Sequence, residues 1–256
     1  MENQSVMNRL TFLGTGTSVG IPRIGCDCAV CRSADVHDKR LRCSALLETD
    51  GLRILIDCSP DFRQQALLHD IRHLDGVILT HEHYDHVGGL DDLRPLGNAR
   101  IYGEQRVLDA ILRVMPYCFG EHKYPGAPDI ELHKVEPDKP FAIGNVEILP
   151  LRVMHGRLPI VGYRIGRFAY ITDASAIADT TISQLQGLDT LVLNALQIPP
   201  HPAHFSLAES LQVAEKIKAR RTWFIHFSDK IGLHAVTNRT LPKGVELAYD
   251  NLTIGL

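Results

Sequence analysis

The stretch Gly76-Val77-Ile78-Leu79-Thr80-His81-Glu82-His83-Tyr84-Asp85-His86 decides the fold of this chain. An apolar run leads directly into three histidines and two acids within six positions. Buried polar groups at the end of a strand need a partner, and imidazole and carboxylate are the ligands that borderline divalent ions prefer. In an extended segment alternate side chains point to one side, so this spacing can present several ligands to one ion. The stretch therefore indicates a metal site at a strand end.

The overall composition describes a globular protein. The 256 residues are 45% hydrophobic and 22% charged, which is typical of a sizeable core, and we predict one domain over residues 1–256. The net charge of −3 gives no general electrostatic footprint for nucleic acid. Met1–Arg9 lacks the apolar centre of a signal peptide, and no apolar run approaches the roughly 20 residues that span a bilayer. We expect a cytoplasmic protein without membrane contact.

Short apolar runs, many of them alternating or β-branched, predict strands along the chain. They are Leu10–Leu13, Ser44–Thr49, Arg53–Asp57, Gly76–Thr80, Arg100–Tyr102, Val146–Val153, Val161–Ile165, Phe168–Thr172, Thr190–Asn194, Thr222–His226, Val245–Ala248 and Leu252–Ile254. Helices are predicted over Asp61–His69, with Ser59-Pro60 at its start, over Glu104–Met115, and from the capping box Ser206–Glu209 onward. Sheets covered by helices follow from this order, either doubly wound or as a two-sheet sandwich.

Three further polar residues lie at or just after strand ends, as the first motif does. They are His155, Asp173 and His226. A lone histidine near a core is more often a hydrogen-bonded packing residue than a ligand. Together with the motif, however, these residues form a candidate ligand set on strand termini, where active sites are commonly assembled.

His-x-His-x-Asp-His after a strand, followed by His, Asp and His, resembles the signature of the metallo-β-lactamase superfamily. This resemblance covers nearly the whole chain and implies an α/β fold, the four-layer αβ/βα sandwich. It implies that His81, His83 and His155 hold one metal ion, that Asp85, His86 and His226 hold a second, and that Asp173 bridges the two. A water between two such ions is acidified and becomes a nucleophile at neutral pH. Asp57 matches a family aspartate that orients a liganding histidine, although a turn-forming role at the strand end is an equal interpretation.

The N-terminal block narrows the resemblance. Leu13–Pro22, followed by Cys26, Cys28 and Cys31, is similar to the phosphodiesterase branch, and most similar to the phosphoribosyl cyclic phosphodiesterase family of the carbon–phosphorus lyase pathway. In that family the three cysteines bind a structural zinc, with a fourth ligand three residues after the last active-site histidine. Here that position is Asp229, which can ligate zinc. His234, His37 or the absence of zinc are the alternatives.

His204 lies two residues before Ser206, hence near a helix N-terminus, where phosphate is favoured. It matches the family histidine that contacts the scissile phosphate, so we assign catalytic roles to His204 and Asp85, with His204 a candidate proton donor to the leaving oxygen. His201 is interpreted as an ordinary loop histidine. The loop 120–128 is a candidate border of the substrate pocket.

These features predict a hydrolase with two active-site ions, manganese or zinc, and one structural zinc. The predicted reaction is attack of a metal-bridging hydroxide on a small cyclic ribose phosphate diester. A tRNA-trailer endonuclease and a thioester or lactone hydrolase are the alternatives; the acidic net charge argues against the first and His204 against the second. A non-catalytic accessory protein would be expected to have a degraded ligand motif. The predicted partner is a small-molecule phosphodiester, with a homodimer as a further expectation.

Overall fold

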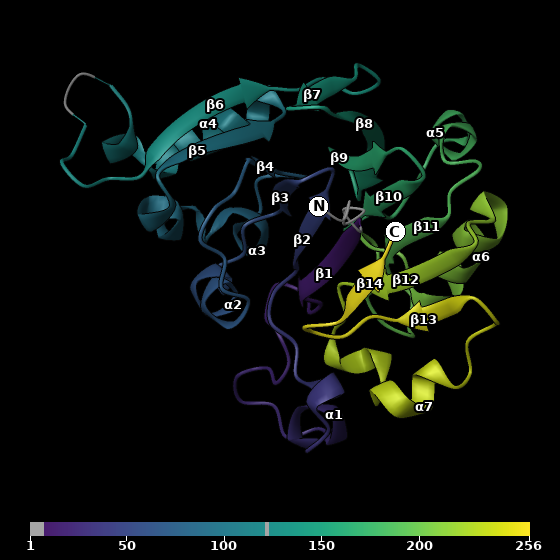
Figure 1. Ribbon diagram of the computed structural model, residues 1–256. Helices are drawn as coiled ribbons and strands as arrows, with labels where there is room; N and C mark the ends of the chain where they lie inside the picture. The colour runs from purple at the N-terminus through teal and green to yellow at the C-terminus, as the bar shows by residue number, and fades with distance from the viewer. Residues whose placement is uncertain (1–7, 121–122) are drawn as a thin grey trace, which may run out of the picture.

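The fold consists of two seven-stranded sheets in a computed structural model that describes residues 8–120 and 123–256. The strand order is β14-β1-β2-β3-β4-β5-β6 in the first sheet and β13-β12-β11-β10-β9-β8-β7 in the second. Figure 1 shows helices α2 and α3 outside the first sheet and α5 and α6 outside the second. Both sheets contain parallel and antiparallel pairs. Two mixed sheets flanked by helices are the four-layer αβ/βα arrangement predicted above.

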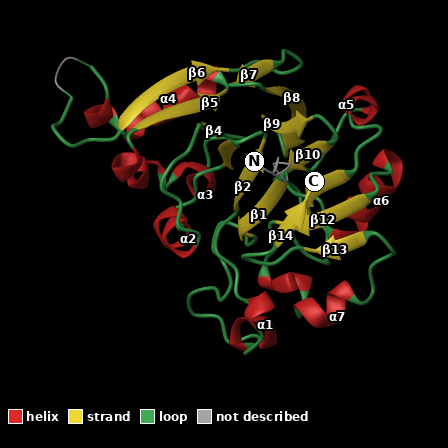
Figure 2. Cartoon of the chain, viewed as in Figure 1, coloured by secondary structure: helices red, strands yellow, loops and turns green. Residues whose placement is uncertain are grey.

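The element bounds are as follows. The first sheet consists of β1 (Arg9–Gly14), β2 (Ser44–Thr49), β3 (Leu52–Ile56), β4 (Gly76–Ile78), β5 (Asn98–Gly103), β6 (Asp129–Lys134) and β14 (Thr253–Gly255). The second consists of β7 (Phe141–Ile143), β8 (Val146–His155), β9 (Leu158–Ile165), β10 (Phe168–Ile171), β11 (Thr190–Asn194), β12 (Arg221–Ile225) and β13 (Val245–Leu247). The helices, red in Figure 2, are α1 (Ala29–Arg32), α2 (Phe62–Leu68), α3 (Tyr84–Val87), α4 (Gln105–Val114), α5 (Asp179–Gln184), α6 (Leu207–Ile217), α7 (His234–Asn238) and the 3₁₀ turns η1 (Val36–Asp38), η2 (Leu90–Leu96), η3 (Pro116–Cys118) and η4 (Asp229–Ile231).

The core lies between the sheets and between each sheet and its helices. Strand β3 illustrates why, because its side chains alternate between the two faces of the sheet. Ile54 and Ile56 pack in the inter-sheet cluster, whereas Leu55 packs in the cluster under α2 and α4. All three are fully buried, so both faces of the strand are covered over Ile54–Ile56.

Several predicted bounds differ from the structure. Helix α2 begins at Phe62, because Ser59 Oγ accepts from the Asp61 backbone N–H and so forms a turn before the helix. Strand β8 continues past Val153 to His155. Strands β6 and β7 were missed; both lie at sheet edges, where the charged residues of β6 weaken the apolar pattern. The hairpin turn at Gly166-Arg167 is confirmed by the pairing of β9 with β10.

The parallel strands bring their carboxyl ends to common edges, and these edges carry the candidate site. Strand β3 runs parallel to β4, and β10, β11 and β12 run parallel to one another. Asp57, Asp173 and His226 follow β3, β10 and β12, and all three have left-handed backbone with φ of 58°, 57° and 62°. Such conformations are unfavourable for non-glycine residues and cluster at functional sites.

Two sequence-based expectations concern residues of which the structure describes only a part. Residues 1–7 of the segment Met1–Arg9, and residues 121 and 122 of the loop 120–128, lie outside the described residues. Within the described ranges, no helix combines the length and apolar character needed to cross a membrane.

Candidate metal centre

The first group of candidate ligands consists of His81, His83, His155 and Asp173. One ligand atom from each lies within 4.8 Å of the others. The Nε2 atom of His81 is 3.0 Å from Nδ1 of His83 and 3.7 Å from Oδ2 of Asp173. His81 and His83 come from the segment between β4 and α3, whereas His155 ends β8 and Asp173 follows β10. The two sheets therefore contribute equally to this group.

The second group consists of Asp85, His86, Asp173 and His226, again within 4.8 Å. His86 Nε2 lies 3.2 Å from Asp85 Oδ2 and 3.4 Å from Asp173 Oδ1. His226 Nε2 lies 3.2 Å from the same Asp173 Oδ1. Asp173 thus belongs to both groups, and its two oxygens face different sets of histidines. This is the position that a carboxylate shared by two cations requires.

Burial and charge at these groups fit a pair of cations. His86 Nε2 is buried and has no hydrogen-bond partner among the described residues, although two carboxylates surround it. Burial lowers the pKa of His81 well below its ordinary value, and neighbouring His86 lowers it further. Burial alone would raise the pKa of Asp173, but His226 and His86 hold it well below its usual range. A neutral imidazole and an ionised carboxylate are the protonation states that bind divalent metals.

Two of the histidines are oriented by acceptors on their second ring nitrogen. Asp57 Oδ2 lies 2.7 Å from His86 Nδ1, and the same carboxylate accepts from the backbone N–H of Thr80 at 2.8 Å. His155 Nδ1 lies 2.7 Å from the carbonyl of Ala203, which can only accept, so Nδ1 carries the proton. In each case the hydrogen bond occupies Nδ1 and leaves Nε2 free for a metal ion. Acceptors on the second ring nitrogen commonly fix the orientation of liganding histidines in this way. The Ala203 contact was missed, because a backbone acceptor leaves no trace in the residue types.

His204 lies against this cluster. Its Nε2 is 3.2 Å from Asp173 Oδ2, and its ring stacks on that of His226 at a centroid distance of 5.1 Å. Burial lowers the pKa of His204 to about 4. His201, which the sequence alone indicates to be an ordinary loop residue, places its Nδ1 3.2 Å from Nδ1 of His204. A neutral His204 carries one N–H, and in the tautomer with this N–H on Nε2 it can donate to an oxygen bound beside Asp173.

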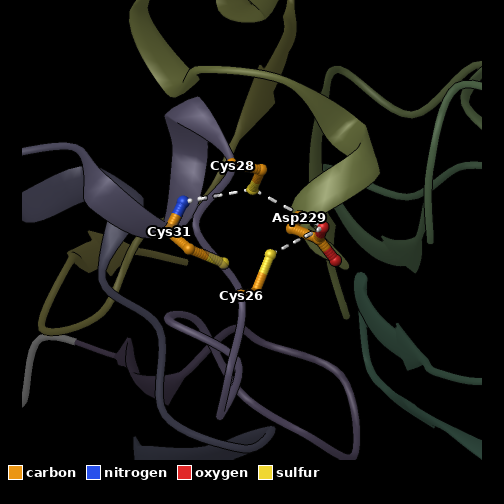
Figure 3. Close-up of side chains that lie close together, drawn as sticks. All are labelled: Cys26, Cys28, Cys31 and Asp229. Carbon is orange, nitrogen blue, oxygen red and sulfur yellow. Dashed lines mark hydrogen bonds between the residues drawn. The ribbon is translucent and has the colours of Figure 1, made fainter.

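Cys26, Cys28, Cys31 and Asp229 form a third group of ligand atoms within 4.8 Å of one another. Figure 3 shows the thiols of Cys26 and Cys28 pointing toward Asp229, whose Oδ2 lies 3.8 Å and 3.6 Å from them. All six cysteines of the chain are free thiols. Three sulfurs and one oxygen at these distances have the donor set and number of a structural zinc site.

The two histidines considered as alternatives to Asp229 lie elsewhere. The rings of His37 and His234 stack on each other at 5.0 Å, and His234 Nδ1 is 3.1 Å from Nη2 of the buried Arg40. Neither histidine belongs to the cysteine group.

Comparison with known proteins places the chain in a family. A model described as beta-lactamase superfamily domain matches residues 52–227. A crystal structure of a diphosphatase from the PhnP family is 42% identical, covers 97% of both chains and superposes with a TM-score of 0.91. Zinc-bound PqqB from Methylobacterium extorquens has a TM-score of 0.81 over 97% of this chain and 100% of its own, but at 19% identity it shows the fold alone.

A curated relative carries a different name. An octanoyltransferase of Porphyromonas gingivalis is 47% identical over 249 residues, or 95% of this chain. The chain spans about half the length of that protein, 51%. A coenzyme PQQ synthesis protein B of Rhodopseudomonas palustris is 30% identical over 84% of this chain and 70% of its own length. Together with the two sheets and the clustered ligands, these matches show that the chain belongs to the beta-lactamase superfamily and has the metallo-β-lactamase fold of metal-dependent hydrolases.

Proposed function

We propose that the protein hydrolyses a phosphorus–oxygen bond in a small phosphodiester, with a cyclic ribose phosphate as the first candidate substrate. The observation that carries this proposal is the placement of Asp173 between two ligand groups, with His204 beside it. Two divalent ions held there, zinc or manganese, would supply an acidified water as nucleophile and would neutralise charge on the phosphoryl oxygens. The 42% identity to a PhnP-family diphosphatase supports phosphorus as the target and adds a diphosphate as a second substrate to test.

In this proposal each residue of the site is assigned to metal binding, to orientation of a ligand or to hydrogen bonding with the substrate. His81, His83 and His155 would hold one ion, Asp85, His86 and His226 the other, and Asp173 both. Asp57 and the Ala203 carbonyl hold the rings of His86 and His155 in place, so the ligands are ordered before an ion enters. His204 would donate its N–H to a phosphoryl oxygen or to the leaving oxygen. Its low pKa keeps the ring neutral at pH 7. His204 therefore acts as a hydrogen-bond donor without adding its own positive charge to that of the metal ions.

A second candidate function is hydrolysis of an acyl thioester at the same ligands. It is favoured by the 47% identity to a protein named octanoyltransferase. That name belongs to a protein about twice as long as this chain, so the named activity can reside in the other half. His204 argues for phosphorus. The alkoxide that leaves a phosphodiester gains from a hydrogen-bond donor, whereas the thiolate that leaves a thioester needs none.

The structural zinc, the partners and the location are parts of the same proposal. Zinc bound by Cys26, Cys28, Cys31 and Asp229 would cross-link α1 and the segment before it to η4, which follows His226 in the chain. We also propose a small-molecule substrate, a homodimer and a cytoplasmic location. The cytoplasmic location is supported by the free cysteines in the candidate zinc site, which fit a reducing compartment.

One substrate screen tests the proposal. Metal-free protein would be reconstituted with Mn²⁺ or Zn²⁺ and offered a cyclic ribose phosphate, a linear aryl phosphodiester, a diphosphate, an octanoyl thioester and a tRNA precursor. We expect turnover of the small phosphorus substrates and none of the tRNA precursor. Cleavage of the thioester without cleavage of any phosphorus compound would replace the first proposal by the second. Asp173→Ala serves as the inactive control in each arm.

A further inference from the structure

Glu82 lies in the chain between two candidate ligands, His81 and His83, yet belongs to neither ligand group. Its Oε1 pairs with Nη1 of Arg106 in the first turn of α4. Its second carboxylate oxygen, Oε2, is buried and makes no hydrogen bond within the described part of the chain. Glu82 therefore depends on Arg106 for its charge balance.

Arg106 also contacts the hairpin that carries His155. Its Nη2 donates to the carbonyl of Pro159 at 2.7 Å. In the β8–β9 ladder Pro159 is paired with Met154, directly beside the terminal pair of His155 and Leu158. One guanidinium thus joins the segment of His81 and His83 to the hairpin of His155, and these three histidines with Asp173 make up the first ligand group.

Other hydrogen bonds join the same two segments, but those among the described residues reach only as far as Thr80. Tyr163 Oη donates to the carbonyl of Leu79 at 2.6 Å, and the Val161 N–H donates to the carbonyl of Thr80 at 3.3 Å. Both lie before His81 in the chain. The contact of Arg106 with Glu82, in contrast, lies between the two ligands His81 and His83 in the chain.

We propose that Arg106 and Glu82 are a positioning pair that sets the spacing of the first ligand group and raises its affinity for a metal ion. The separation between His83 and His155, whose ring centroids are 5.0 Å apart, has to be held across two sheets. A guanidinium that bridges Glu82 and the Pro159 carbonyl can do so, because its planar fork fixes the directions of both its partners. Loss of such outer support costs metal sites about tenfold to a hundredfold in affinity. The proposal holds for any substrate.

Arg152 offers a matched control. It also pairs with a glutamate, Glu104, and donates to a β9 carbonyl, that of Ile160 at 3.2 Å. Its partner precedes α4 and does not lie between ligands. Removing Arg152 therefore perturbs the same hairpin through a similar ion pair without touching the segment of His81 and His83.

The test measures metal affinity in the full chain. Wild type, Arg106→Gln, Glu82→Gln, the double variant and Arg152→Gln would be stripped of metal and titrated with Zn²⁺ against a chromophoric chelator. We expect Arg106→Gln and Glu82→Gln each to weaken one active-site ion by about tenfold to a hundredfold and to leave the other ion near its wild-type affinity. The double variant should lose no more than the worse single one, because the two residues act as a unit. Thermal unfolding of the metal-free forms checks that Arg106→Gln and Arg152→Gln are equally folded.

Wild-type affinity in Arg106→Gln, or an equal loss in Arg152→Gln, would overturn the proposal. If Arg106→Gln does not fold, the nearly isosteric Glu82→Gln decides in its place. A wild-type chain that binds no ion at these histidines would overturn both this pair and the metal assignment. A wild type that binds its ions but hydrolyses no phosphorus compound would overturn the proposed function alone.

Discussion

Asp57 Oδ2 lies 2.7 Å from Nδ1 of His86, and neither side chain is exposed to solvent. Asp57 directly follows β3 and His86 lies in α3, so this contact fixes the ligand helix to the sheet. Burial would lower the pKa of His86, but Asp173, Asp85 and Asp57 raise it well above its ordinary value. The metal-free cluster therefore favours a proton on His86, and a metal ion has to displace it.

Asp57→Asn should weaken the second ligand group. Asparagine tolerates the left-handed backbone at this position, so the change removes charge without adding strain. We expect about a tenfold to hundredfold loss of affinity for one active-site ion, because His86 loses its charged acceptor. Chelator competition measures it. Asp70→Asn is the matched control, since Asp70 is also left-handed at φ 47° but lies on the surface; an equal loss there would contradict the assigned role.

Asp229→Ala should remove the structural zinc, whereas Asp229→His should retain it, because histidine is also a tetrahedral zinc ligand. Loss of the zinc should lower the unfolding temperature by several degrees, since a bound metal stabilises the folded state. Metal analysis and thermal unfolding check both variants. Asp27→Ala is the control, because Asp27 lies between two of the cysteines but is exposed and pairs with Arg32. Full zinc content in Asp229→Ala would exclude Asp229 as a ligand.

His204→Ala should retain both active-site ions and lose about a hundredfold to a thousandfold in turnover, the usual contribution of one hydrogen-bond donor to a transition-state oxygen. The loss should be largest for a substrate with a poor leaving group and smallest for an aryl phosphodiester. A uniform loss across leaving groups would show that His204 donates its hydrogen bond to a phosphoryl oxygen and not to the leaving oxygen. His73→Ala, a change at an exposed histidine paired with Asp75, controls for general effects.

Acid should destabilise the fold through His234. Its Nδ1 accepts from Arg40 at 3.1 Å, so protonation removes a hydrogen bond and places a cation beside a buried guanidinium. Burial, Arg40 and His37 lower the pKa of His234 from 6.5 to about 4. Between these values the unfolded chain binds more protons than the folded one, so stability falls as pH falls through this window. His234→Gln should show a shallower fall in urea unfolding between pH 6.5 and 4; an unchanged slope would contradict this role.

The residue types and strand ends made much of the site predictable. Histidines and acids directly after apolar runs indicated ligands at one edge, and the structure brings His81, His155 and Asp173 together there. The partners that hold them were not predictable in the same way. The Ala203 carbonyl and the guanidinium of Arg106 act through tertiary contacts more than 20 residues away in the chain. Strand β6 escaped prediction because an edge strand buries too little to show an apolar pattern.

The central claim is that Asp173 holds two metal ions at once. The most direct measurement is electron paramagnetic resonance of metal-free protein titrated with Mn²⁺, because ions that share a carboxylate about 3.5–4 Å apart are exchange-coupled. We predict a coupled-pair spectrum that saturates at two active-site ions per chain and disappears in Asp173→Ala. Saturation with only the signal of isolated ions, in wild type as in Asp173→Ala, would contradict the shared site.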